Sequence, residues 1–222
     1  NLTKENNHPY YERAVVKTTY FHYNNSKDYS KAKTLYQKLQ AIASTVQNKQ
    51  LAKIGILKSS YRLKNHLEVI EIAKLIEGDG EISQDIKSEA IYFKAISLYH
   101  TQNYKTAIPT LETLSKDKSS SKGAECTYYL ASSYHHLKDY KKSNEILLKS
   151  KDEYGSYESW VVRYFILIGY NHHKLKDDFQ AKATLESIIN NYQGDEDILK
   201  EARERLAEIN ASIKSQSKVK YK

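Results

Sequence analysis

The sequence predicts an all-α fold, and three observations lead to that prediction. The 222 residues include only seven glycines and two prolines, which is too few to supply the turns of a β-sandwich or barrel. Neither G-x-G-x-x-G nor G-x-x-x-x-G-K-[ST] occurs, which excludes the Rossmann and P-loop classes. The third observation is an internal repeat with helical periodicity. With 40% hydrophobic residues, we expect one large domain or two small ones.

The repeat consists of five segments in which one packing residue is followed twelve positions later by another, with Asp or Asn between them. Successive first sites are 37, 38, 36 and 38 residues apart. The first sites are Tyr20, Leu57, Ala95, Ala131 and Gly169, and the second sites are Ala32, Val69, Ala107, Ser143 and Ala181. A nearly constant period over five copies indicates a repeat architecture.

Each segment is predicted to form two antiparallel helices joined by a short polar turn. The first helix carries apolar residues at helical spacing, as in Tyr92, Ala95 and Tyr99. The Asp or Asn of the turn is expected to accept hydrogen bonds from the N–H groups that open the second helix. Small residues allow close approach at the helix crossings, so Ala107→Trp or Ala181→Trp is expected to unfold its neighbourhood.

These residues resemble the tetratricopeptide repeat (TPR), a 34-residue helix–turn–helix unit. The resemblance covers about residues 10 to 193 and is closest in the last three copies. Tyr20 and Leu57 replace the small residue in the first two copies, and Pro109 lies within a second helix in place of the usual terminal Pro. The resemblance implies a right-handed superhelical solenoid of about five repeats within residues 1–194. We expect these repeats at approximately residues 10–46, 47–80, 82–118, 121–155 and 156–193.

A change of character after Gly194 predicts a separate terminal helix at 195–214, followed by a basic flexible tail at 215–222. An apolar stripe runs from Ile198 to Ile213, and we expect Glu201 and Arg205 to form an i, i+4 ion pair. Such a helix would cap the apolar face of the last repeat. The alternative is a docking helix for a partner.

The first helices of a stacked solenoid line its concave wall. Projecting helical offsets onto that wall gives a surface rich in Tyr and His, with a few cations and no carboxylate. We therefore predict a groove that binds a protein or peptide segment, with an acidic segment as one option. The candidate residues are Lys58, Tyr61, Arg62, Tyr92, Tyr99, His100, Tyr128, His135, Tyr170, His173 and Lys174. A carboxylate clamp like that of chaperone-binding TPR proteins is not inferred, because Phe21 stands where that clamp has Asn.

The net charge of +8 raises an alternative, in which nucleic acid or another polyanion binds the Lys-rich surface. Only five of the 35 basic residues are Arg, so nucleic acid is not the expected partner. No apolar run is long enough to span a bilayer. The chain contains no Met, and we expect it to be a piece of a longer protein.

No catalytic or cofactor chemistry is predicted. Cys126 lies on a predicted helix without a base, and the loop around Asp79 lacks the ligand spacing of a calcium site. Adjacent histidines on a helix point about 100° apart, so the His pairs at 135–136 and 172–173 do not chelate a metal by themselves. His100, His135 and His173 could converge across neighbouring repeats, but hydrogen-bonded or exposed imidazoles are expected instead.

Localisation is inferred only from a resemblance in style. The segment Phe179–Glu186 in its Lys-, Asn- and Tyr-rich setting resembles TPR proteins of bacterial cell envelopes. A periplasmic or envelope location is therefore favoured over the cytoplasm.

Overall fold

The computed structural model describes the backbone of residues 10–219 and the side chains of residues 10–215. Within this part the chain forms eleven α-helices and one π-helical turn, and it contains no strand, which confirms the all-α prediction. No helix there has both the length and the apolar composition that crossing a bilayer requires.

The chain divides into two compact units, residues 1–103 and 104–222. The first contains α1 (Tyr11–Tyr20), the π-helical turn η2 (Phe21–Asn25), α2 (Tyr29–Ile42), α3 (Val46–Arg62), α4 (His66–Gly78) and α5 (Gln84–His100). The second contains α6 (Tyr104–Leu114), α7 (Ser121–His136), α8 (Tyr140–Ser150), α9 (Glu158–Lys174), α10 (Asp178–Asn191) and α11 (Glu196–Val219).

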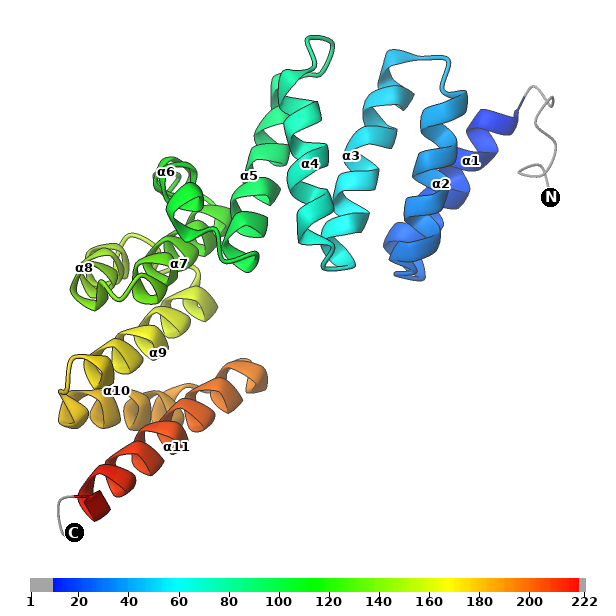
Figure 1. Ribbon diagram of the computed structural model, residues 1–222. Helices are drawn as coiled ribbons and strands as arrows, with labels where there is room; N and C mark the ends of the chain where they lie inside the picture. Colours follow the sequence, from blue (N-terminus) through cyan, green and yellow to red (C-terminus); the bar gives the residue numbers. More distant parts are fainter. Residues whose placement is uncertain (1–9, 220–222) are drawn as a thin grey trace. The chain divides into compact units, whose positions relative to one another are not determined.

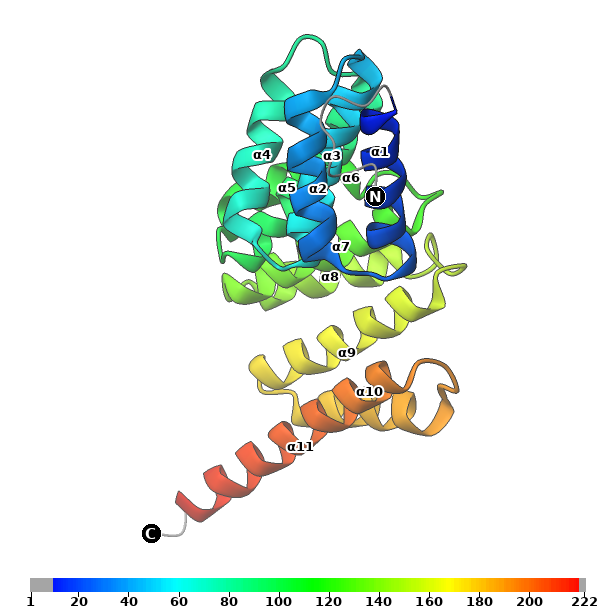
Figure 2. The same cartoon turned by 90° about the vertical axis from the view of Figure 1, so that its right-hand side faces the viewer.

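Within each unit, every α-helix packs against the next one along the chain (Figure 1). Alternate helices also touch, as α3 does α5, α7 does α9 and α9 does α11. Figure 2 shows the stacked order of α9, α10 and α11 in the second unit. This neighbour-on-neighbour packing is that of a helical repeat solenoid.

The turns between first and second helices share one backbone conformation. Among residues 10–219, five that are not glycine have positive φ, and they lie at the spacing of the repeat: Lys27, Lys64, Gln102, Lys138 and Lys176. In the last four copies the turn is a Schellman motif; for example, Lys138 N–H donates to the His135 carbonyl and Asp139 N–H to the Tyr134 carbonyl, each at 2.9 Å. The left-handed residue thus ends the first helix in every copy.

The predicted caps are present where the turn carries Asp and absent where it carries Asn. The side chains of Asp28, Asp139 and Asp177 accept hydrogen bonds from the N–H three residues later. Asn65 and Asn103 use their amide N–H groups instead, toward Glu68 and Thr101. The prediction was therefore wrong for Asn65, whose side chain makes no cap hydrogen bond.

The first repeat departs from the predicted register. Tyr20, predicted as its packing residue, is 64% exposed, whereas Thr19 is 1% exposed. The π-helical turn η2 follows at once and inserts an extra residue before the inter-helix turn, which moves the buried position back by one. The packing residue of this copy is Thr19, a smaller side chain that fits the crossing as the repeat requires.

The terminal helix α11 packs on α10 and α9 through the predicted stripe. Ile198, Ala202 and Ile209 are fully buried in a core cluster with α10. The helix continues to Val219, so residues 215–219, predicted as part of the flexible tail, are helical. Residues 220–222 of that tail lie outside the described residues.

Candidate functional site

In the first unit, several candidate residues have partners inside the protein. Lys58 on α3 forms an ion pair with Glu89 on α5 at 2.8 Å, which places a carboxylate on a wall predicted to have none. Tyr61 packs against the ring of Phe93 at 4.7 Å. Tyr92 is only 8% exposed, so it contributes mainly to the core. Tyr99 is half-buried.

Arg62 and His100 take part in a contact that recurs between repeats. In three copies, the last residue of a first helix stacks on the first residue of the preceding second helix. The Arg62 guanidinium carbon lies 6.0 Å from the centroid of the Tyr29 ring. The ring centroids are 4.5 Å apart for His100 and His66, and 4.7 Å apart for His136 and Tyr104. Sequence reasoning assigned Arg62 and His100 to ligand contact, whereas the structure also gives each of them a packing role between repeats.

In the second unit, three side chains from three helices converge on the Tyr170 ring. The Lys174 ammonium lies 4.8 Å from the ring centroid, the Arg205 guanidinium 4.4 Å and the His135 ring 5.2 Å. We call His135, Tyr170, Lys174 and Arg205 the Tyr170 cluster. Tyr128 lies on the same helix as His135 and packs near Trp160 at 5.9 Å.

Sequence reasoning missed Arg205, because the candidate wall was projected from the first helices of the repeats and did not include α11. The predicted pair of Glu201 with Arg205 was wrong. Glu201 instead binds Arg163 on α9 at 2.7 Å, and Arg205 binds Glu208 at 3.1 Å. Packing of α11 against α9 supplies Glu201 with a cation from another helix and turns Arg205 toward Tyr170.

A hydrogen-bond network places a proton on Nδ1 of His135. The Asn171 amide nitrogen donates to Ser143 Oγ and Asn144 Oδ1, both at 2.8 Å. The Asn171 oxygen therefore accepts from His135 Nδ1–H, at 2.6 Å. Burial lowers the pKa of His135, and the charges of Lys174 and Arg205 act in the same direction. His135 is consequently neutral at pH 7, and the positive charge of the cluster lies on Lys174 and Arg205.

His173 binds within its own helix pair, and its ring also lies 6.4 Å from the Tyr170 ring, centroid to centroid. It is 8% exposed, and its Nδ1 lies 2.6 Å from Asp178 Oδ1 at the start of α10. Among the described residues, no three His, Cys, Asp or Glu side chains are grouped to hold a metal ion. The suggested convergence of His100, His135 and His173 on a metal therefore receives no support.

The comparisons with known proteins agree with the fold. Residues 165–194 match a family model described as a tetratricopeptide repeat. This segment runs from the second half of α9 through α10 and corresponds to the fifth predicted repeat. A search of curated proteins gives no match. The family match at residues 165–194 and the all-helical neighbour-on-neighbour packing fit a tetratricopeptide-repeat protein.

Proposed function

We propose that this protein is a non-catalytic interaction scaffold that binds an acidic protein segment on the first-helix face of its second unit. The Tyr170 cluster is the observation that carries the proposal. Tetratricopeptide repeats generally serve as protein-interaction scaffolds, and stacked helix pairs offer extended surfaces suited to a peptide.

The chemistry of the cluster favours a ligand segment in which a carboxylate side chain lies beside an aromatic or aliphatic side chain. Tyr170 offers a large contact area at a low entropic cost. Lys174 is exposed and forms no ion pair within residues 10–215, so its charge is available to a ligand. Arg205 is only partly neutralised by the surface carboxylate of Glu208. An acidic segment would replace the water around these two cations.

A charge-reversal experiment tests the proposal. Two peptide arrays with the same aromatic content, one carrying Glu and the other Lys at the charged positions, are probed with the full chain. We expect preferential retention of Glu peptides, and roughly tenfold weaker binding to the Lys174→Glu variant. Lys141→Glu, which reverses an exposed lysine on α8, is the matched control and should bind like the wild type. Equal retention of both arrays would reject the proposal.

The polyanion alternative predicts a different outcome in the same assay. If the Lys-rich surface acted as a whole, Lys141→Glu and Lys174→Glu would weaken binding to a similar extent. Binding to single-stranded DNA would then fall steeply with salt.

We further propose an envelope location for this protein. The support is the resemblance of the Phe179–Glu186 segment to envelope TPR proteins. Fractionation of the source cells followed by immunodetection tests it, and recovery only in the cytosolic fraction would reject it.

A further inference from the structure

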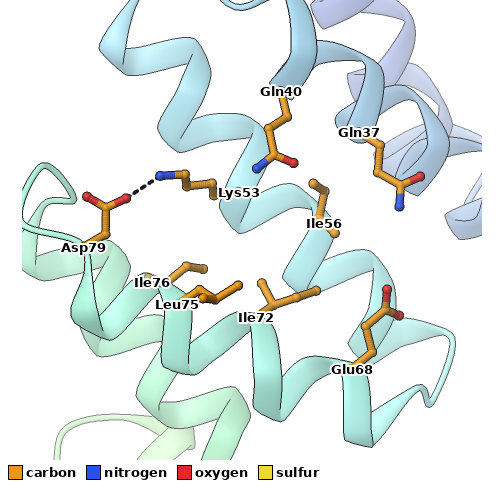
Figure 3. Close-up of a pocket in the computed structure, with 9 residues that line it drawn as sticks. All are labelled: Gln37, Gln40, Lys53, Ile56, Glu68, Ile72, Leu75, Ile76 and Asp79. Atoms are coloured by element: carbon orange, nitrogen blue, oxygen red, sulfur yellow. Dashed lines mark hydrogen bonds and ion pairs between the residues drawn. The ribbon is translucent and has the colours of Figure 1, made fainter.

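A second candidate binding surface lies in the first unit. It is formed mainly by the second helices of two repeats rather than by the first helices. A cavity of about 480 Å³ opens between the second helices α2 and α4, with α3 as its floor. Figure 3 shows side chains from all three helices directed into this space. We call it the α2–α4 groove, and its lining residues are Gln37, Gln40, Lys53, Ile56, Glu68, Ile72, Leu75, Ile76 and Asp79.

The centre of the groove is aliphatic, and one of its side chains is far more exposed than packing requires. Ile56 and Ile76 are buried at the base, whereas Leu75 is 74% exposed. The other four repeats carry Lys38, Thr113, Lys149 and Ser187 at the position of Leu75. Because the other four repeats have a polar residue at this position, packing of the repeat does not require an apolar residue there.

Both ends of the groove are closed by ion pairs. Lys33 binds Glu68 at 2.5 Å at one end, and Lys53 binds Asp79 at the other. Hydrogen bonds from the lysines hold the pKa of each carboxyl below its ordinary value, against the opposing effect of burial, so the pairs persist at neutral pH. The charges that border the groove are thus matched within the protein. An occupant complementary to this charge distribution is uncharged at its centre.

Two side-chain amides supply the polar contacts. Gln37 and Gln40 are exposed on α2, and their amides form no hydrogen bond with another described residue. Each amide can both donate and accept. The backbone of an extended segment offers unpaired N–H and C=O groups to such amides, whereas the backbone of a helix is already satisfied internally.

The length of the groove sets the size of the occupant. Glu68 near the start of α4 and Asp79, which directly follows its last residue, mark the two ends and are eleven residues apart. At 1.5 Å per residue, this corresponds to roughly 16 Å. An extended chain covers that distance in about five residues.

We propose that the α2–α4 groove binds a short, uncharged, extended segment of a partner protein, with an aliphatic side chain over Ile56, Ile72 and Ile76. Its backbone is held by Gln37 and Gln40. This site is separate from the Tyr170 cluster and goes beyond the proposed function.

The chain offers a matched pair of leucines for the test. Leu75 and Leu67 both lie on α4 and are 74% and 71% exposed, but only Leu75 lines the groove. A displayed library of random seven-residue peptides is selected on the full chain. We expect enrichment of uncharged aliphatic peptides whose affinity drops roughly tenfold or more for Leu75→Glu, because a charge would enter an apolar contact. Leu67→Glu should bind them as the wild type does.

Methyl NMR locates the bound peptide without relying on any variant. Selected peptides should shift the isoleucine methyl signals of Ile56, Ile72 and Ile76, while Ile166 in the second unit stays unchanged. Failure to enrich any peptide, or binding that Leu75→Glu leaves intact, would overturn the proposal. A lower solution mass for Leu75→Glu than for the wild type would also overturn it, since a second copy would then be the occupant. Loss of binding through Lys174→Glu alone would assign the peptides to the Tyr170 cluster instead.

Discussion

Replacing lysines that have a left-handed backbone conformation in the inter-helix turns by glycine should stabilise the protein. Lys138 and Lys176 have φ values of 66° and 69°, where a Cβ atom crowds the neighbouring carbonyl. Relief of that crowding is worth about 1–2 kcal/mol per site, and the greater freedom of glycine in the unfolded chain offsets about 0.5–1 kcal/mol. The loss of a cation at the helix C-terminus removes a further ~0.3 kcal/mol. The double variant Lys138→Gly/Lys176→Gly should therefore gain about 1 kcal/mol.

The comparison with alanine isolates the backbone contribution. Lys138→Ala/Lys176→Ala loses the same two charges but retains Cβ, so it should be less stable than the glycine double variant by about 1–2 kcal/mol. Urea unfolding followed by helical circular dichroism measures this difference. On heating, a gain of 1 kcal/mol corresponds to about 2–4 °C in Tm for a chain of this size.

An internal control reverses the expected sign. Lys141 lies three residues beyond Lys138, in the first turn of α8, and is exposed. There, Lys141→Gly should be less stable than Lys141→Ala, because glycine disfavours the helical conformation. If glycine were no better than alanine at positions 138 and 176, the strain assigned to these turns would be refuted.

Three further predictions concern titratable and tightly packed groups. The free energy of unfolding should decrease as pH falls below about 6.5. Burial lowers the pKa of the stacked His66 and His100, the charge of Lys64 acts on both in the same direction, and the unfolded chain therefore takes up protons first. The urea midpoint of His100→Gln should fall less over the same interval. Gly55→Ala should cost about 1–3 kcal/mol in urea unfolding, because a Cβ there would lie 2.3 Å from a tyrosine ring, while Gly78→Ala meets no atom within 4 Å and should be tolerated. Cys126 should react with thiol reagents only after unfolding, since burial raises its pKa to about 12; rapid labelling of the native protein would contradict this.

The repeat could be predicted from sequence because its strictest feature is a local one. The spacing of 37, 38, 36 and 38 residues between predicted first sites is also the spacing of the positive-φ residues from Lys27 to Lys176. The Asp that follows each of three such residues caps the next helix, so the signal lies within a few residues of chain. Helix pairing then follows from short turns and apolar periodicity.

What could not be predicted depends on contacts between helices that are distant in sequence. Arg205 was assigned to Glu201 by its i, i+4 spacing, yet Arg163 on α9 takes that carboxylate and leaves Arg205 against Tyr170. The π-helical turn has no glycine or proline to announce it, so the shift from Tyr20 to Thr19 was invisible. The offsets also project first helices only, and for this reason the α2–α4 groove was never considered.

Internal repetition separates what the fold needs from what it merely permits. Ala107 and Ala181 are fully buried at helix crossings, and nearly every copy has a small side chain at such a site, as packing demands. Leu75 breaks the pattern in the opposite direction, because it is apolar and exposed where the other copies are polar. Arg62 and Lys174 are each the last residue of a first helix. Arg62 lies over Tyr29, the first residue of the preceding helix, whereas Lys174 lies over Tyr170 on its own helix. The packing of the repeats requires neither of these two departures. Leu75 lies in the α2–α4 groove and Lys174 in the Tyr170 cluster, the two surfaces proposed for binding.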